Sequence, residues 1–396
     1  MNTEIQQQLF AERVQNVPPS FLREILKVAA NPGITSFAGG LPNPSFFPVD
    51  ELQQSANRVL QQRGRQVLQY APTEGYFPLR EAICQRYERT HGLHINPEQV
   101  LITNGSQQAL DLVGKLFLDP ADLVLLERPT YLGALQCFSM FQPLFRQANL
   151  LTDGIDTNEV EMHLQTNAIK LFYCIPNFQN PTGIQYSLEK RQELANILSK
   201  HQTIIVEDDP YGDINFGEER LPPLYSYLPE QTILLGTFSK TIAPGLRLGW
   251  MIANEAIIKK ATIIKQATDL HSGNLAQYMI HDFLCRHNVD DHIARIKNGY
   301  RQQKDVMMDC LENYFPGGVA FIKPKGGMFT WITLSEKNTA RDFLQKAMER
   351  NILFVPGDTF YTSEPDLQTL RFNYSNVEEK EMRKAMMILG EILKAL

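Results

Sequence analysis

A single lysine, Lys240, stands in the hydroxyl-rich turn of GTFSKTIAPGLRLGW, shortly after an apolar run that ends at Thr237. Arg247 follows seven residues later, just before the next apolar run. A lysine at a strand end, beside hydroxyls and a guanidinium, suits an amine of lowered pKa that forms a Schiff base with a carbonyl cofactor. Thr237, Ser239 and Arg247 together have the groups to bind a phosphate. A lysine in a loop is more often simply solvated, so this segment alone does not assign a function.

Three acidic residues, Glu207, Asp208 and Asp209, end the apolar run of TIIVEDDPY at positions 203–211. Acidic side chains at the carboxyl end of a parallel strand point into the crevice where α/β proteins bind ligands. A buried carboxylate there holds a pyridine nitrogen in its protonated form, which makes the ring an electron sink. Magnesium binding and a role in capping a helix or turn are the alternatives, and the cluster itself leaves them open.

Two further polar turns follow apolar runs. NFQNPTG (177–183) presents Asn180 beyond the run KLFYCI, although most Asn-Pro pairs only form a turn. ITNGSQQALDLV (102–113) predicts a strand, a glycine turn and a helix opened by Ser106 and Gln107. Free N–H groups at that helix start form a phosphate cradle without a P-loop, and an ordinary N-cap is the alternative.

The elements that must position these residues alternate along the chain. Apolar runs rich in β-formers predict strands at 100–103, 122–127, 170–175, 203–208, 232–237 and 247–253. Amphipathic stretches at 107–117 and 188–201 predict helices between them. This alternation indicates βαβ units on a mostly parallel sheet flanked by helices, which is an α/β fold.

The predicted domains divide the chain into three parts. Residues 1–45 form an N-terminal arm that joins the small domain, and residues 46–290 form the large α/β domain. Residues 291–396 form a smaller α+β domain, since charged helices around 290–313 and 338–350 accompany the short strands of FTWITL, ILFVPG and LRFNYS.

Composition excludes several classes of protein. The 396 residues include 43% hydrophobic and 21% charged residues, which suits a large folded core rather than a disordered chain. With 38 basic against 44 acidic residues the net charge is −6, so we expect no nucleic-acid partner. No apolar run suits a membrane span and the polar N-terminus is no signal peptide, so we expect a cytoplasmic protein. Five scattered cysteines without a C-x-x-C pair indicate neither a disulfide framework nor a metal site.

In their order along the chain, these motifs resemble the fold-type I pyridoxal-phosphate enzymes. The closer resemblance is to the class I/II aminotransferases of the 2-aminoadipate and kynurenine subgroup. It is carried by FAGGLPNPSFFP, LQYAPTEGYFPLR, ITNGSQQALDLVGK, ERPTYLGAL, NFQNPTG, VEDDPY, GTFSKTIAPGLRLGW and PKGGMF. It covers most of the chain and implies pyridoxal 5′-phosphate as the cofactor.

The resemblance implies a role for each matched residue. Lys240 would be the Schiff-base lysine and proton carrier, and Asp208 would pair with the pyridinium nitrogen. Asn180 and Tyr211 would bind the 3′-oxygen, and Tyr131 would stack on the ring. The phosphate would be held by Ser106, Gln107, Thr237, Ser239 and Arg247. Tyr70 would reach the phosphate of the neighbouring subunit, which implies a homodimer with active sites shared across the interface.

For the substrate, the resemblance implies that Arg371, in TLRFNYS, takes the α-carboxylate in a bidentate pair. Asn180 and the backbone near Gly40 would help. Without the resemblance, a surface ion pair would be the simpler interpretation of Arg371.

Ser20 and Arg23 match a helix of the relatives that closes over the substrate. Three residues apart, they share one helix face, and Arg23 would bind a second carboxylate, as in glutamate or 2-aminoadipate. An ion pair between Arg23 and Glu24 is the alternative. Phe21, Leu22 and Phe46 equally suit leucine-like or aromatic side chains.

The expected activity is ping-pong transfer of an amino group from an amino acid to a 2-oxo acid, with 2-oxoglutarate as the acceptor. The motifs do not exclude a pyridoxal-phosphate β-lyase or decarboxylase. An effector-sensing domain of an aminotransferase-like transcription regulator is a more remote alternative. About 40 residues precede FAGGLPNP, which is too few for the winged helix that such regulators add.

Overall fold

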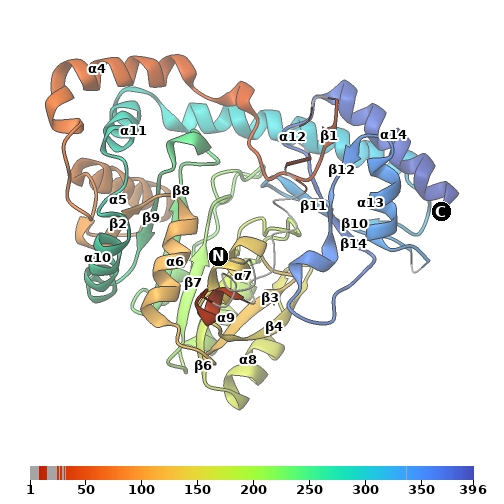
Figure 1. The fold of residues 1–396 in the computed structure, drawn as a ribbon, viewed down its shortest axis with the longest axis horizontal. Coiled ribbons are helices and arrows are strands. Elements are labelled where there is room, and N and C mark those ends of the chain that lie inside the picture. The colour runs from red at the N-terminus through yellow and green to blue at the C-terminus, as the bar shows by residue number, and fades with distance from the viewer. Residues whose placement is uncertain (1–8, 16–24, 26, 29–30, 32, 336) are drawn as a thin grey trace.

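The computed structural model describes residues 9–15, 25, 27, 28, 31, 33–335 and 337–396. Ser20 and Arg23, with most of the predicted N-terminal helix, lie outside these residues. The described part of the chain forms a large sheet and a small sheet, each with its own helices, and a further pair of two short strands (Figure 1). No helix among the described residues has both the length and the apolar character that crossing a membrane requires.

The large sheet has eight strands in the order β2-β9-β8-β7-β6-β3-β4-β5. The strands are β2 (Val100–Thr103), β3 (Leu123–Arg128), β4 (Leu144–Leu151), β5 (Gly154–Ile155), β6 (Ile169–Cys174), β7 (Ile204–Asp208), β8 (Thr232–Thr237) and β9 (Gly249–Ile252). The central strands β4, β3, β6, β7 and β8 are parallel, whereas β9 runs antiparallel to β2 and β8, and β5 antiparallel to β4. The predicted α/β fold with a mostly parallel sheet is therefore confirmed.

Helices cover both faces of this sheet, which explains why its central strands are apolar along their whole length. Successive residues alternate between the faces: Tyr173 and Val206 join the core under α6, α7 and α10, while Phe172 and Ile205 join the core under α8 and α9. The helices of this part are α4 (Val49–Val67), α5 (Phe77–His91), α6 (Ser106–Phe117), α7 (Leu132–Ser139), α8 (Thr157–Thr166), α9 (Leu188–Leu198), α10 (Glu255–Asp269) and α11 (Asn274–Arg286).

The small sheet is antiparallel, with the strand order β10-β11-β14-β13. Its strands are β10 (Ala320–Phe321), β11 (Phe329–Thr333), β13 (Val355–Pro356) and β14 (Thr369–Asn373), accompanied by α12 (Val289–Tyr314), α13 (Ala340–Met348) and α14 (Glu379–Ala395). The long helix α12 runs from the side of α11 to that of α14 and so links the two parts (Figure 1). In the arm, β1 (Thr35–Ser36) pairs with β12 (Ile352–Leu353).

The remaining described helices are short: α2 (Glu12–Gln15) and 3₁₀ turns at Pro44–Phe46, Pro97–Gln99, Leu224–Ser226, Pro244–Leu246 and Gly357–Phe360. The predicted limits of the domains, at residues 45 and 290, stay a prediction.

The observed strands differ from the predicted ones in several places: the short strands β1, β5 and β10 were not predicted, nor was β4, and one predicted strand is shorter. The sequence did not predict β4, because LFRQANLL mixes polar with apolar residues and lies half-exposed near the sheet edge. The strand expected over 247–253 is shorter, because Arg247 has a left-handed backbone (φ 51°) and ends the preceding 3₁₀ turn instead of opening β9.

Candidate active site

A cavity of about 260 Å³ opens at the carboxyl ends of β7 and β8, with walls from the large sheet, the arm and the small sheet. Most of the predicted site residues line it: Gly40, Ser106, Gln107, Tyr131, Asn180, Asp208, Tyr211, Thr237, Ser239, Lys240, Arg247 and Arg371. Residues far apart in the sequence meet here because the ends of parallel strands share one edge of a sheet.

Asp208 is the last residue of β7 and is only 2% exposed. Its Oδ2 accepts a hydrogen bond from the Tyr173 hydroxyl at 2.9 Å, whereas its buried Oδ1 has no partner among the described residues. Burial raises the pKa of Asp208 to about 7, opposed by the Tyr173 hydrogen bond. A buried carboxylate with one spare oxygen in a cavity fits a positively charged ring nitrogen.

The other two acids of the cluster do not line this cavity. Glu207 faces the opposite side of the sheet, where Oε2 accepts from the Tyr225 N–H at 3.0 Å and Oε1 lies 4.0 Å from Arg191 Nη1. Asp209 instead lines a second cavity, between the segment 209–213 and helix α5. Strand alternation thus separates the cluster, and no group of three potential metal-binding residues occurs in the described part of the chain.

Lys240 follows β8 and is half-buried. Its Nζ donates a hydrogen bond to the Gly40 carbonyl oxygen at 2.8 Å. Burial and the positive charges of Arg371 and Arg247 lower the pKa of Lys240 to about 8, against the opposing effect of Asp208. An amine with this pKa is partly neutral near pH 7 and is therefore a usable nucleophile.

At one end of the cavity, Arg247 lies against the loop that opens α6. Its Nη2 donates to the Asn104 carbonyl oxygen at 3.1 Å. A Cβ atom on Gly105 (φ +78°) would lie 2.7 Å from Nη2, so glycine is needed both for the backbone conformation and for this close approach. The first N–H groups of α6, beginning at Ser106, have no acceptors within the helix. Together with the Thr237 and Ser239 hydroxyls, 2.9 Å apart, these donors form a cradle that fits a phosphate.

At the other side, Arg371 of β14 is buried to 2% exposure. Nη1 donates to Asn180 Oδ1 at 2.7 Å, and Nη2 donates to the Ala38 carbonyl oxygen. The guanidinium lies over the Phe329 ring, 4.4 Å from its centroid. Burial lowers the pKa of Arg371 to about 10, so it remains charged at neutral pH. A buried guanidinium without a carboxylate partner among the described residues is suited to a carboxylate ligand.

Tyr131 and Tyr211 line the cavity between these two ends. The Tyr131 hydroxyl lies 3.4 Å from Gln107 Oε1. Burial raises the pKa of Tyr211, opposed by a hydrogen bond with Asn180. Both tyrosines therefore stay protonated at neutral pH and act as neutral donors.

Sequence reasoning missed the residues that hold the site from behind. Tyr173 supports Asp208, and Glu127, at the end of β3, accepts hydrogen bonds from Gln179 Nε2 at 3.0 Å and from the Tyr186 hydroxyl at 2.7 Å. Gln179 precedes Asn180 in the turn, so this buried group fixes the turn. The available signal was a polar residue within an otherwise apolar predicted strand.

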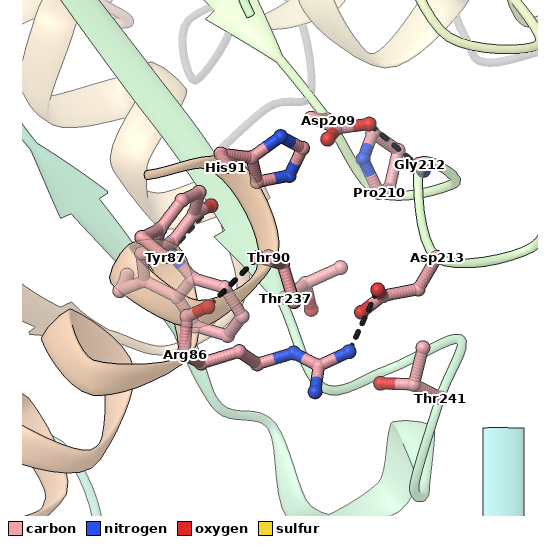
Figure 2. A pocket seen from close by; sticks show the side chains of 11 residues that line it. Arg86, Tyr87, Thr90, His91, Asp209, Pro210, Gly212, Asp213, Thr237 and Thr241 are labelled. Carbon is pink, nitrogen blue, oxygen red and sulfur yellow. Dashed lines mark hydrogen bonds and ion pairs between the residues drawn. The ribbon is translucent and has the colours of Figure 1, made fainter. Parts of the chain in front are cut away.

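A second, smaller cavity of about 40 Å³ adjoins the first, since Pro210 and Thr237 line both; Figure 2 shows the residues around it. Asp209 and Asp213 face it. Arg86 Nη2 from α5 binds Asp213 Oδ1 at 2.7 Å, which the dashed line in Figure 2 marks. Residues 208–213 thus separate the two cavities. Asp208 and Tyr211 line the first, whereas Asp213 lines the second and pairs with Arg86 of α5.

Tyr70 lies away from the cavity, 78% exposed, with its ring edge-on to His271. Its proposed reach to a neighbouring subunit stays a prediction.

Comparison with known proteins gives matches over nearly the whole chain. The aromatic-amino-acid aminotransferase 1 of Thermococcus litoralis is 37% identical over 97% of this chain and 94% of its own length. The 2-aminoadipate transaminase of Thermus thermophilus is 38% identical over 98% of this chain and 97% of its own length. The crystal structure of Pyrococcus horikoshii kynurenine aminotransferase superposes with a TM-score of 0.94, at 35% identity and 98% coverage of both chains.

The family model of aminotransferase class I and II matches residues 40–389, which include both sheets and the cavity between them. This match and the superposition confirm the predicted fold-type I architecture, the aminotransferase and its cofactor, pyridoxal phosphate. The chain belongs to the aminotransferase class I and II family.

Proposed function

We propose that this aminotransferase moves the amino group of an amino acid to a 2-oxo acid, with 2-oxoglutarate as the acceptor, in two ping-pong half-reactions. The observation that carries the proposal is the placement of Lys240, Asp208 and Arg371 around one cavity. We further propose a broad donor range: 2-aminoadipate and glutamate together with leucine-like or aromatic amino acids. The names of the relatives, which include aromatic and 2-aminoadipate donors, support this range.

Three independent features make the cavity suited to bind pyridoxal phosphate. Asp208 Oδ1 is buried without a partner among the described residues, the Lys240 amine has a lowered pKa, and Gly105 keeps the phosphate cradle open. When bound, the cofactor supplies a conjugated ring that takes up an electron pair from the substrate and carries the amino group between half-reactions. Asp208 would hold the ring nitrogen protonated, which strengthens that electron sink.

The protein's own groups divide the remaining work. The Arg371 guanidinium would bind the substrate α-carboxylate in a bidentate pair, with Asn180 and the Gly40 backbone beside it, and so orient the substrate Cα. Lys240 Nζ would take the proton from Cα and deliver it within the cavity, because it is the flexible base at the centre of the site.

The other lining residues would bind and orient the cofactor. Tyr131 would stack on the ring, and Asn180 and Tyr211 would donate hydrogen bonds to its 3′-oxygen. The phosphate would lie against Ser106, Gln107, Thr237, Ser239 and Arg247.

A homodimer would complete the site, with Tyr70 of one subunit reaching the phosphate held by the other. The high exposure of Tyr70 supports this role, because an aromatic ring open to solvent is suited to burial in an interface between subunits. Ser20 and Arg23 would contact an acidic substrate side chain. The cytoplasmic location expected from the sequence also stays a prediction.

The test is a visible absorbance spectrum of the purified protein, followed by titration with amino acids. We expect a cofactor band that bleaches with glutamate and 2-aminoadipate and returns with 2-oxoglutarate. Bleaching by aromatic or branched donors alone would support the proposed transfer reaction but contradict the proposed contact of Arg23 with an acidic side chain. Bleaching without return by any 2-oxo acid would favour a β-lyase or decarboxylase. Absence of a band, even after addition of pyridoxal phosphate, would contradict the proposed site.

A further inference from the structure

We propose that Lys265 and Asp269, outside the cavity, are positioning residues that hold the loop Asn104–Gly105–Ser106 in its phosphate-binding shape. The proposal rests on the function above, because it assumes that this loop binds the cofactor phosphate. The two residues lie one turn apart at the carboxyl end of α10, and neither lines the cavity.

Lys265 is a buried lysine whose hydrogen bonds, within the described part of the chain, go to Asp269 and Gln108, the two residues that in turn bond Asn104 of the loop. Its side chain is 0% exposed, and Nζ donates to Asp269 Oδ1 at 2.9 Å and to Gln108 Oε1 at 2.9 Å. Burying an ammonium group is costly unless it is paired. The burial of Lys265 is therefore not explained by an ion pair that stabilises a helix at the protein surface.

Asp269 is likewise in a place that helix physics disfavours. It is the last residue of α10, where the helix dipole repels a negative charge. Its Oδ2 accepts hydrogen bonds from Asn104 Nδ2 and from Gln108 Nε2, both at 2.6 Å. The Asp269 carboxylate thus compensates the charge of the buried Lys265 and binds the loop before α6 through Asn104.

The network fixes both the side chain and the backbone of Asn104. Gln108 Oε1 accepts from the Asn104 N–H at 2.8 Å, while the Asn104 carbonyl oxygen accepts from Arg247 Nη2 at 3.1 Å. A continuous path of hydrogen bonds therefore runs from Lys265 through Asp269 and Asn104 to Arg247. Loosening its far end would move the guanidinium and the first N–H groups of α6, which are the phosphate donors.

This position predicts an effect that depends on the phosphate. A variant of the network would weaken binding of pyridoxal phosphate and leave binding of pyridoxal, which has no phosphate, nearly unchanged. Loss of general stability would weaken both. The variants are Lys265→Met, Asp269→Asn and Asn104→Ala, the last of which keeps the Lys265–Asp269 pair.

The same helix offers a matched control. Lys259 pairs with Glu255 at 3.2 Å with the same four-residue separation, but its side chain is 74% exposed. Lys259→Met and Glu255→Gln therefore repeat the chemical changes without touching the loop.

The experiment measures equilibrium binding of pyridoxal phosphate and of pyridoxal to the apoprotein variants by the visible band. We expect roughly tenfold or greater loss of affinity for pyridoxal phosphate, as for a charge-assisted hydrogen bond, and less than about twofold for pyridoxal. The control variants should match the unaltered protein with both ligands.

Equal weakening of both ligands, or no change in either, would overturn the positioning role. If Lys265→Met fails to fold, Asn104→Ala decides the question by the same ratio. Failure of the unaltered protein to bind pyridoxal phosphate would be a separate result, since it would contradict the cofactor site itself and, with it, this proposal.

Discussion

The Tyr173 hydroxyl donates a hydrogen bond to Asp208 Oδ2 at 2.9 Å from the neighbouring strand of the sheet. Both side chains lie on the face that carries the cavity, and Tyr173 is fully buried. Because one carboxylate oxygen is occupied from behind, the other is left for a ligand in front. Tyr173 therefore sets both the orientation of Asp208 and its tendency to ionise.

Replacing Tyr173 by Phe should shift the pH dependence of catalysis. The hydrogen bond stabilises the ionised carboxylate and lowers its pKa, so its loss should raise the Asp208 pKa above its present value of about 7. A group with a raised pKa is ionised only at higher pH, so the acid limb of kcat/KM should move to higher pH. We also expect a loss of stability of about 1 to 2 kcal/mol.

Tyr374→Phe is the control, because the Tyr374 hydroxyl is also buried and donates a hydrogen bond, to the Gly326 carbonyl oxygen at 2.8 Å, but Tyr374 does not line the cavity. An unchanged acid limb in Tyr173→Phe, with the same loss of stability as this control, would show that Tyr173 acts only in packing.

Cofactor uptake by the apoprotein should follow the ionisation of Lys240. Only the neutral amine attacks a carbonyl, and the pKa of Lys240 is lowered to about 8. The rate of uptake should therefore rise with pH and level off above about pH 8. With a lysine of ordinary pKa, the rate would continue to rise past pH 10. Stopped-flow absorbance at a series of pH values measures this profile.

Arg371→Met tests the cause of that shift. The positive charge of Arg371 lowers the pKa of Lys240, so its removal should move the uptake profile to higher pH. Arg383→Met, on α14 and paired with Asp309 and Glu379, should leave the profile in place. A profile that does not move in Arg371→Met contradicts the electrostatic coupling.

Arg371→Lys should weaken substrate binding for every amino donor. Lysine keeps the charge but cannot form the planar bidentate pair, and it would leave Asn180 Oδ1 and the Ala38 carbonyl without their present donor. We expect kcat/KM to fall roughly 30-fold to 150-fold, mainly through KM. Steady-state kinetics with glutamate, leucine and phenylalanine would show the same loss for each donor. A loss confined to acidic donors would assign Arg371 to the side chain instead of the α-carboxylate.

Mixed dimers test whether Tyr70 acts across the interface. Tyr70→Ala and Lys240→Ala should each lower activity strongly, by roughly a hundredfold or more for the lysine. If each site takes Lys240 from one subunit and Tyr70 from the other, a dimer of the two variants keeps one intact site.

Refolding the two variants together in equal amounts gives mixed dimers as half of the population. Activity should then return to about a quarter of the unaltered level, because only one site in each mixed dimer is intact. Recovery should be absent when either variant is refolded alone. No recovery in the mixture, with dimers present by light scattering, would place Tyr70 outside the partner's site.

The sequence predicted the strand ends that bear Asp208, Asn180 and Lys240 because each is an apolar β-rich run followed by a polar turn. It did not predict β4, whose mixed polarity at the sheet edge hides the pattern. Among Glu207, Asp208 and Asp209, the cluster alone did not choose the residue that faces the ligand, and the family resemblance pointed to Asp208.

Local sequence determined which residues end the strands and which turns follow them, since apolar periodicity and turn chemistry act over a few residues. The tertiary structure decided the partners. Strand alternation turned Glu207 toward Arg191, strand pairing placed Tyr173 behind Asp208, and chain folding placed Lys265 beside the loop at Asn104. Such contacts join residues far apart in the sequence; the Asn104–Asp269 hydrogen bond, for example, spans 165 positions. They depend on packing that no local pattern records.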